Sequence, residues 1–196
     1  MKLPKEFYTQ NDTLKIAREL LGKTLVVPDE NGRRVSGMIV ETEAYQGPAD
    51  KAAHSHNNRR TKRTEVMYAQ GGIVYVFFVY GMYFQFNVVT GKEDVPHAIL
   101  IRAVEPIDGI EIMRSRRGKM PDKNLTSGPG KLCIAFGIDK GFNGEDLSGD
   151  MVWIEDGEPL SDDRVVCGRR IGIDYAEEYA EKNWRFYLEG NNFISR

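Results

Sequence analysis

Residues 73–89 read IVYVFFVYGMYFQFNVV, and this stretch decides the fold. It is too rich in β-branched and aromatic residues for a helix, and these residue types favour strands. Its glycine, Gly81, is typical of a turn between two strands. We therefore expect a hairpin whose two strands meet near Gly81 and Met82.

Shorter strand and turn patterns occur on both sides of this hairpin. The pair Asn31-Gly32 is typical of a tight turn between paired strands. We expect further strands at residues 24–27, 35–45, 98–104, 152–154, 165–166 and 185–188. Together with the hairpin, they predict a mainly antiparallel sheet.

Three helices are predicted between these strands. A polar cap at residues 11–13 precedes apolar residues at helical spacing, and Gly22 ends that helix. Asp108 is expected to cap a second helix, and Ser127 a third that starts near Pro129. Residues 47–67 are expected to form a polar loop with at most a short helical turn.

Length and composition are those of one globular domain. The chain has 196 residues, of which 41% are hydrophobic and 10% aromatic, which is enough for a packed core. We therefore expect an α+β fold that forms a single domain over residues 1–196. Its parts are a curved, mainly antiparallel sheet, flanking helices and a protruding aromatic β-hairpin.

Cysteine content and hydropathy indicate the cellular compartment. The two cysteines, Cys133 and Cys167, are too few for a disulfide scaffold and are expected to be buried free thiols in a reducing compartment. No apolar run reaches the roughly 18–20 residues that a bilayer span needs. The first residues do not resemble a secretory signal. We expect a cytoplasmic protein, associated with the nucleoid if the source is prokaryotic.

The charges are segregated along the chain, although the net charge is only −2. Eight acids and no Lys or Arg lie within residues 141–163. Basic residues gather in two stretches: Arg59, Arg60, Lys62 and Arg63, and then Arg114, Arg116, Arg117, Lys119 and Lys123. This pattern suits a protein that binds a polyanion on one face, and the alternative is a pair of solvated loops.

A second candidate for phosphate binding is the segment Ser-Gly-Pro-Gly-Lys at residues 127–131. It resembles a phosphate loop only in composition. A helix N-terminus there, with Lys131 in its first turn, can hold a backbone phosphate. A plain turn explains the same residues equally well.

The most informative charged residues are Glu41, Glu43 and Arg102. Because Glu41 and Glu43 lie two residues apart on a strand, both side chains leave the same face. Arg102 stands alone in an apolar strand, and a buried guanidinium needs an acid, for which Glu43 or Glu41 are the natural partners. One of the two carboxylates is a candidate general base, and the alternative is that both lie on a solvated sheet face.

Two histidines and one asparagine add polar candidates. His54 and His56 have a spacing that a metal could use, but no accompanying ligand cluster is present, so we expect no metal and no other cofactor. His54 is expected to face the same pocket as Tyr45. Asn87 is polar within an apolar strand and needs a hydrogen-bond partner.

The aromatic hairpin has more large side chains than its tip can bury. Most of its rings belong to the core, but Tyr80, Met82 and Tyr83 are expected to be exposed. Exposed rings near basic loops suit stacking on nucleic-acid bases. An apolar wedge at the tip also suits the separation of two base pairs.

Six short strings, in this order and spacing, resemble the alkyladenine (3-methyladenine, methylpurine) DNA glycosylase family. They are LLGK at 20–23, VETEAY at 40–45, AAHS at 52–55, VYGMYF at 79–84, RAVEP at 102–106 and SGPGKLC at 127–133. Residues 185–187 also fit the final strand of that family. The resemblance extends from about residue 14 to residue 187.

The resemblance implies a base-excision-repair enzyme that flips a damaged purine out of duplex DNA and hydrolyses its N-glycosidic bond, leaving an abasic site. It implies Glu43 as the general base that activates water, with Arg102 positioning it. In the lesion pocket it implies Tyr45, His54 and Phe77 around the base, and Asn87 as the residue that excludes normal guanine. At the DNA surface it implies Tyr80 as the wedge.

Two departures from the resemblance concern the pocket. Mammalian members have tyrosine where this chain has Phe77, and Gln85 replaces a smaller residue. The implied lesions are 3-methyladenine and 7-methylguanine, with hypoxanthine and ethenoadenine as further candidates. We expect a monofunctional enzyme without a lysine nucleophile, acting as a monomer on double-stranded DNA and not on membranes.

Three other classes of protein use some of the same features. A non-catalytic single-strand or RNA-binding module uses the aromatic and basic residues but leaves Glu43 and Arg102 unexplained. A small-molecule glycosidase uses paired carboxylates, but neighbours on one strand do not flank a bond from opposite sides. A purely structural domain needs no surplus of rings at a hairpin tip.

Overall fold

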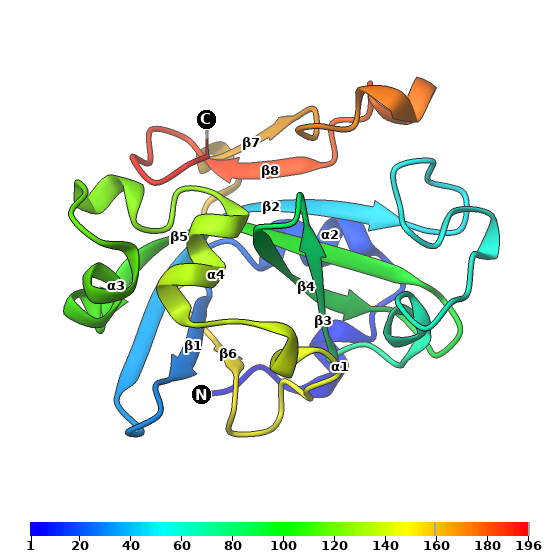
Figure 1. Ribbon diagram of the computed structural model, residues 1–196. Helices are drawn as coiled ribbons and strands as arrows, with labels where there is room; N and C mark the ends of the chain where they lie inside the picture. Colours follow the sequence, from blue (N-terminus) through cyan, green and yellow to red (C-terminus); the bar gives the residue numbers. More distant parts are fainter. Residues whose placement is uncertain (159, 196) are drawn as a thin grey trace.

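Two long antiparallel strands, β2 (Arg34–Gln46) and β5 (His97–Asp108), form the centre of the sheet (Figure 1). The computed structural model describes residues 1–158 and 160–195, without the side chain of residue 162. The sheet has eight strands in the order β3-β4-β5-β2-β1-β6, and β8 pairs with both β2 and β7. This open antiparallel sheet with helices around it confirms the predicted α+β class.

The remaining strands lie close to the predicted positions. They are β1 (Thr24–Pro28), β3 (Val74–Val79), β4 (Tyr83–Thr90), β6 (Trp153–Glu155), β7 (Val165–Gly168) and β8 (Arg185–Leu188). The turn between β1 and β2 contains the predicted Asn31-Gly32 pair. The carboxylate of Asp29 accepts hydrogen bonds from the amides of Asn31 and Arg33, so the turn is held by its own side chain.

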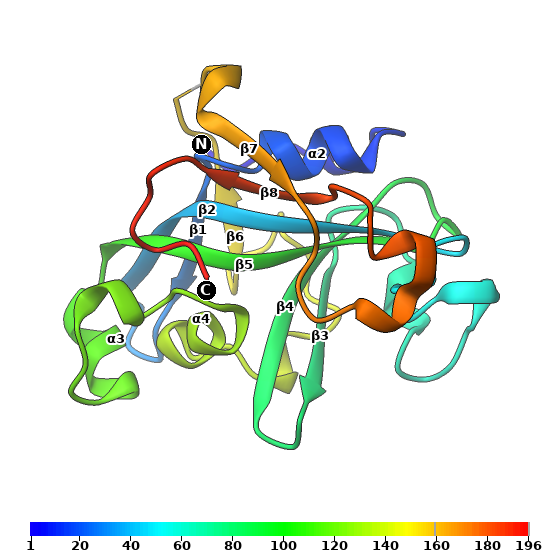
Figure 2. The same ribbon diagram turned by 90° about the horizontal axis from the view of Figure 1, so that it is seen from above.

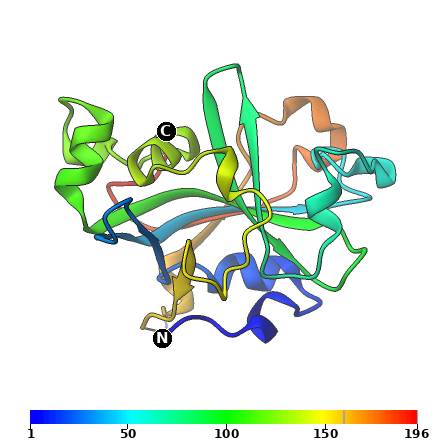
Figure 3. The ribbon, with the colours of Figure 1, turned by 60° about the horizontal axis from the view of Figure 1, so that its bottom comes forward.

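The hairpin of β3 and β4 projects from the rest of the sheet (Figures 2 and 3). Its two turn residues, Tyr80 and Gly81, have φ angles of 55° and 68°, and Val79 pairs with Tyr83. Positive φ at both central residues is the turn geometry that matches the twist of paired strands. The loop between the strands consists of Tyr80, Gly81 and Met82, which agrees with the predicted meeting point near Gly81 and Met82.

Three helices cover the two faces of the sheet. Helix α2 (Thr13–Glu19) lies on one face, and α3 (Ile110–Arg117) and α4 (Pro129–Phe136) lie on the other (Figure 2). Asp12 caps α2 by accepting a hydrogen bond from the amide of Lys15, as the cap pattern predicts. Shorter helical elements complete the fold: α1 (Lys5–Tyr8), η1 (His56–Asn58), η2 (Glu65–Tyr68), η3 (Asp122–Asn124), η4 (Lys140–Phe142), η5 (Asp162–Arg164) and η6 (Asp174–Tyr179).

Two predicted helix caps are wrong. Asp108 ends β5 and accepts hydrogen bonds from Ser36 and Arg34, while Gly109 precedes α3. Gly128, and not Ser127, precedes α4, and the Ser127 hydroxyl instead accepts a hydrogen bond from Lys131. Asp108 is taken by contacts with a distant strand, and Ser127 by a lysine in the first turn of the helix that it is predicted to cap.

The core lies on both faces of the central strands. Rings and branched side chains such as Phe86, Ile99 and Ile101 are fully buried there, together with the free thiol of Cys133. The prediction that Cys167 is also buried is wrong, because it lies exposed on β7. No described helix is long and apolar enough to cross a membrane.

Candidate active site

A cavity of about 140 Å³ opens between the hairpin, β5 and two loop segments. The predicted residues Tyr45, His54, Phe77, Tyr80, Asn87 and Arg102 all line it. Its other lining residues include Tyr75, Gln85, Leu100, Ile171, Gly172 and Tyr175. The fold therefore brings together residues from β2, β3, β4, β5 and the loops after β2 and β7, which are far apart in the sequence.

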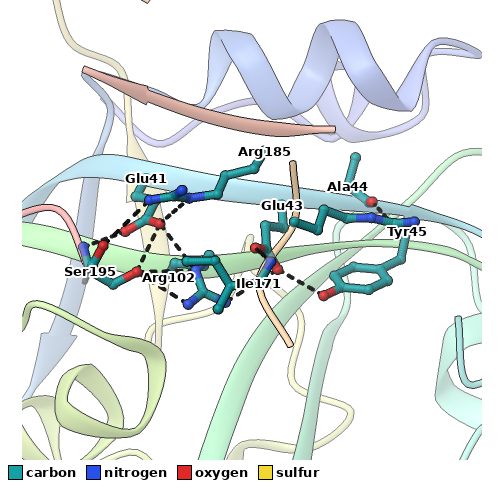
Figure 4. A network of polar contacts seen from close by, with 9 residues as sticks. Glu41, Glu43, Ala44, Tyr45, Arg102, Ile171, Arg185 and Ser195 are labelled. Carbon is teal, nitrogen blue, oxygen red and sulfur yellow. Dashed lines mark hydrogen bonds and ion pairs between the residues drawn. The ribbon is translucent and has the colours of Figure 1, made fainter. Parts of the chain in front are cut away.

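Glu43 lies directly behind this cavity with a fully buried side chain. Its Oε2 accepts a hydrogen bond of 2.8 Å from the Tyr45 hydroxyl and lies 3.2 Å from Nη1 of Arg102. Its Oε1 accepts a hydrogen bond of 2.8 Å from the backbone amide of Ile171. Figure 4 shows these contacts. All three partners line the cavity, so Glu43 contacts the wall of the cavity from behind.

Glu41, the other carboxylate on the same strand face, is also fully buried but has different partners. Its Oε1 accepts hydrogen bonds from Nε of Arg102, Nε of Arg185 and the hydroxyl of Ser195, at 3.1, 2.6 and 2.8 Å. Its Oε2 accepts one from the Ser195 amide at 2.6 Å. The predicted alternative, that both acids lie on a solvated face, is wrong.

Arg102 is the group that joins the two carboxylates, as the isolated arginine predicts. Burial is the largest influence on it and opposes its charge, but the carboxylates of Glu43 and Glu41 outweigh burial and raise the pKa of Arg102. Burial, followed by the nearby charge of Glu43, raises the pKa of Tyr45 well above its ordinary value. Tyr45 therefore keeps its proton and donates a hydrogen bond to Glu43.

A second buried ion pair holds the loop that supplies the Ile171 amide. The guanidinium of Arg170 makes two hydrogen bonds to Asp50, at 2.5 and 2.9 Å, and both side chains are fully buried. It also lies 4.7 Å from the centre of the Tyr45 ring and 5.0 Å from that of Trp184. This pair connects the loop after β7 to Tyr45 and to the loop after β2.

One wall of the cavity is formed by aromatic rings and a neutral histidine. His54 Nδ1 lies 3.0 Å from the Tyr75 hydroxyl, and its ring packs edge-on to Phe77 at 4.5 Å. Nη2 of Arg63 donates to His54 Nε2 at 3.3 Å, which places the imidazole proton on Nδ1. Burial, followed by the charges of Arg63 and Arg59, lowers the pKa of His54 to about 4.

The histidines have separate partners. His56 Nδ1 lies 3.0 Å from the backbone oxygen of Pro48, whereas His54 is directed to the cavity. Within residues 1–158 and 160–195, no three potential ligand side chains come close enough to hold a metal ion.

Asn87 and Gln85 close the side of the cavity formed by β4. The Asn87 amide nitrogen donates to the backbone oxygens of Tyr75 and Gln85, at 3.1 and 3.4 Å. The predicted need of Asn87 for a partner is thus met by the hairpin backbone. These bonds fix a side chain that is 3% exposed and lines the cavity.

The hairpin tip is exposed, as predicted. The exposed fractions are 80% for Tyr80, 64% for Met82 and 37% for Tyr83. Tyr83 is the most covered of the three because its ring lies against the first turn of α4. A Cβ atom on Gly130 would lie 2.9 Å from the Tyr83 ring, so only glycine leaves room for this contact.

The basic residues divide into paired and unpaired ones. Arg60 is bound to Glu65 and Asp94, and Arg114 to Glu111 and Asp122. Arg116 and Arg117 donate to backbone oxygens at the ends of nearby helices. Lys131 donates to Ser127 at 3.3 Å.

Arg59 and Arg63 line a second, wider cavity of about 660 Å³ that shares His54 and Tyr175 with the first. Lys62 lies between them in the sequence and is exposed. Of the two basic stretches, the first therefore places positive charge beside the aromatic cavity.

Sequence reasoning missed several residues of the site, namely Tyr75, Asp50, Arg170, Ile171, Tyr175, Arg185 and Ser195. The sequence does indicate Tyr75, because it lies two residues from Phe77 on the same strand and therefore faces the same side. Ile171 contributes a backbone amide, for which a side-chain pattern gives no signal. Tyr175 is 69% exposed in the short helical element η6, which has no sequence periodicity.

The lowered pKa of His54 predicts how stability depends on pH. The unfolded chain takes up a proton near its ordinary pKa of about 6.5, while the folded protein resists protonation down to about pH 4. The contribution of His54 to stability is therefore complete above about pH 6.5 and is lost as the pH falls towards 4. We expect His54→Gln to lose less unfolding free energy than the parent over this window, measured by urea unfolding. Equal losses in both proteins would contradict the assignment.

The chain is similar to known proteins of one family. The model of the family described as methylpurine-DNA glycosylase matches residues 6–192. A protein of Clostridium novyi (strain NT) is 50% identical over 203 residues, which cover 100% of this chain and 98% of that protein. A protein of Desulfitobacterium hafniense (strain Y51) is 52% identical over 204 residues, covering 99% and 98%. Both are named, provisionally, as 3-methyladenine DNA glycosylases.

Proposed function

We propose that this chain, which belongs to the methylpurine-DNA glycosylase family and is a DNA glycosylase, hydrolyses the N-glycosidic bond of alkylated purines by a Glu43-activated water. The enzyme flips 3-methyladenine or 7-methylguanine from duplex DNA and leaves an abasic site. The observation that carries the proposal is the arrangement of Glu43, buried behind an aromatic cavity with part of its carboxylate unoccupied.

The hydrogen bonds of the two carboxylates favour Glu43 over Glu41 as the base. An ionised carboxylate has about four acceptor positions. Glu41 accepts from four donors, on Arg102, Arg185 and the amide and hydroxyl of Ser195, and of these residues only Arg102 lines the cavity. Glu43 has three partners, two of them on Oε2, so its Oε1 retains a position that can accept a proton from water.

The cavity suits a cationic purine. Alkylation at N3 or N7 puts positive charge on the base and weakens its bond to the sugar, so little acid assistance is needed. A cation between aromatic rings gains about 0.5–2 kcal/mol. His54 adds no competing charge at neutral pH, because burial lowers its pKa to about 4. Hypoxanthine and ethenoadenine lack this charge, so we rank them below the alkylated bases.

Two residues of β4 set the width of the cavity. We propose that Asn87 excludes guanine, whose exocyclic amine needs the space that this side chain fills. Its two hydrogen bonds to the hairpin backbone keep it from moving aside. Phe77 can stack on the base but has no hydroxyl for a hydrogen bond. The half-buried Gln85 narrows the cavity beside Asn87.

The hairpin tip supports a wedge role for Tyr80. This residue lines the cavity and yet is 80% exposed, so one ring lies between the cavity and solvent. We propose that it fills the gap left by the flipped nucleotide, with Met82 and Tyr83 against the neighbouring DNA. Extrusion of a base costs a few kcal/mol, which such a wedge offsets.

Charge near the cavity supports contact with the DNA backbone. Arg59, Lys62 and Arg63 are exposed beside the site, and we propose that they bind phosphates. Arg60 is bound to Glu65 and Asp94, so we assign it a structural role. Lys131, in the first turn of α4 near Tyr83, is a further candidate phosphate contact.

We further propose that the enzyme is monofunctional and acts as a single domain, as a monomer, in the compartment that holds the DNA. Among the described residues, none that lines the cavity is a lysine. A Schiff-base nucleophile, which strand cleavage requires, is therefore not part of the proposed chemistry.

Replacing the proposed base tests the function. Glu43→Gln should lower the single-turnover release of 3-methyladenine from methylated duplex by roughly 10²–10⁴-fold, because general base catalysis is worth about that much. Chromatography of the released base measures it. Glu93→Gln, at an exposed site in the turn between β4 and β5, serves as the control. Release by Glu43→Gln at the parental rate would refute the assignment, and binding without release by the parent would favour a binding module.

Removing the Tyr80 ring tests the wedge. Tyr80→Ala should weaken binding to a duplex with an abasic site by about tenfold, because a stacked ring is worth about 1–3 kcal/mol. Fluorescence anisotropy of labelled duplex measures the affinity. Phe78→Ala is the control, since Phe78 is 51% exposed on the same hairpin and does not line the cavity. Equal affinities for Tyr80→Ala and the parent would remove the wedge role.

The salt dependence of DNA binding tests the division of the basic residues. Arg59→Ala should lower the slope of log K against log salt by about one, because each phosphate contact releases counterions. Arg60→Ala should keep the parental slope, since its guanidinium is already paired. Identical slopes in the parent and Arg59→Ala would exclude a phosphate contact at Arg59.

A further inference from the structure

We propose that Glu41, Arg185 and Ser195 form a clamp that positions Arg102, and that Ser195 is a positioning residue for the reaction at Glu43. This inference rests on the proposed function of Glu43. None of the three clamp residues lines the cavity. They act through Arg102, which does (Figure 4).

The clamp holds one side of the Arg102 guanidinium. Nε of Arg102 lies 3.1 Å from Glu41 Oε1 and 3.3 Å from the Ser195 hydroxyl, and Nη2 lies 3.2 Å from the same hydroxyl. Two of the three guanidinium nitrogens are therefore bound on the side away from Glu43. A planar guanidinium fixed at two nitrogens also fixes the direction of the third.

The third nitrogen, Nη1, lies 3.2 Å from Glu43 Oε2. A free arginine prefers to bind a carboxylate with two parallel hydrogen bonds, one to each oxygen. Here the clamp holds Nε and one of the two N–H groups of Nη2, and it fixes the guanidinium in an orientation in which Nη1 contacts Glu43. The contact of Nη1 falls on Oε2, so Arg102 does not occupy the acceptor position on Oε1 that the proposed water needs.

Charge balance explains why Glu43, Arg102 and the clamp together contain two acids and two arginines. Glu41 and Glu43 are fully buried, and Arg102 and Arg185 lie against them. A buried carboxylate without a counter-charge is costly. Arg185 neutralises Glu41 at 2.6 Å, so the charge of Arg102 remains available to Glu43.

Ser195 is the part of the clamp whose contribution is most specific. Its hydroxyl donates to Glu41 Oε1 and accepts from Arg102, while its amide donates to Glu41 Oε2. The side chain is neutral, so its removal changes no charge. Without the hydroxyl, Nη2 of Arg102 loses its partner and the guanidinium is free to turn towards both oxygens of Glu43.

The test separates catalysis from binding. Ser195→Ala should lower the single-turnover rate of 3-methyladenine release by about tenfold to hundredfold, because small misplacements of catalytic groups cost up to about 10²-fold. Its affinity for an abasic-site duplex should stay within twofold of the parent. Ser195→Thr, which keeps the hydroxyl, should restore the rate. Ser115→Ala, an exposed serine on α3, is the control.

Three results would overturn the inference while leaving the proposed function in place, provided that the parent releases base and Glu43→Gln does not. The first is a parental rate in Ser195→Ala, and the second is a failure of Ser195→Thr to restore it. The third is an equal loss of rate and DNA affinity, which indicates general structural damage. If Ser195→Ala does not fold, Arg185→Lys, which keeps the charge beside Glu41, should show the same loss of rate with unchanged affinity.

Discussion

The interaction on which the structure depends is the contact of one guanidinium, that of Arg102, with two buried carboxylates. Glu41 and Glu43 leave the same face of β2 because they are two residues apart, and Arg102 faces them from β5. Removing any member of such a group leaves a buried charge uncompensated, at a cost of about 3–5 kcal/mol. The two acids are alike in burial but have different partners.

The rest of the site is arranged around this group in two halves. On one side, Arg185 and Ser195 bind Glu41, and Ser195 also binds Arg102. On the other, Tyr45 and the Ile171 amide hold Glu43, and the Asp50–Arg170 pair fixes the loop that supplies that amide. The aromatic cavity and the exposed tip of the hairpin lie in front of Glu43. The proposed general base, the cavity proposed to hold the extruded purine and the proposed wedge thus lie in one place.

The sequence predicts the parts of this arrangement that depend on local pattern. The aromatic hairpin, the alternation along β2 and the isolation of Arg102 in an apolar strand are visible as residue types at fixed spacing. The pairing of Arg102 with the two acids follows from the cost of burying a charge. The predicted caps at Asp108 and Ser127 are wrong because Arg34, Ser36 and Lys131, which are distant or on the next turn, take those side chains.

Contacts made by loops are beyond such reasoning. Ser195 and Arg170 lie in irregular segments, so no periodicity indicates that they reach β2. The amide of Ile171 acts through its backbone, and any residue type other than proline supplies the same donor. The charge clusters suggest more free positive charge than the folded protein has. Arg60 and Arg114 belong to basic stretches but are neutralised by acids that folding brings close.

The most direct test of the account is a crystal structure of the protein bound to duplex DNA that contains a cationic pyrrolidine analogue of the abasic sugar. The account predicts an ordered water within hydrogen-bond distance of Glu43 Oε1 that faces the analogue, with Arg102 still bound to Glu41 and Ser195. A Glu43 that remains sealed from solvent, with both of its oxygens covered by Arg102, would contradict it.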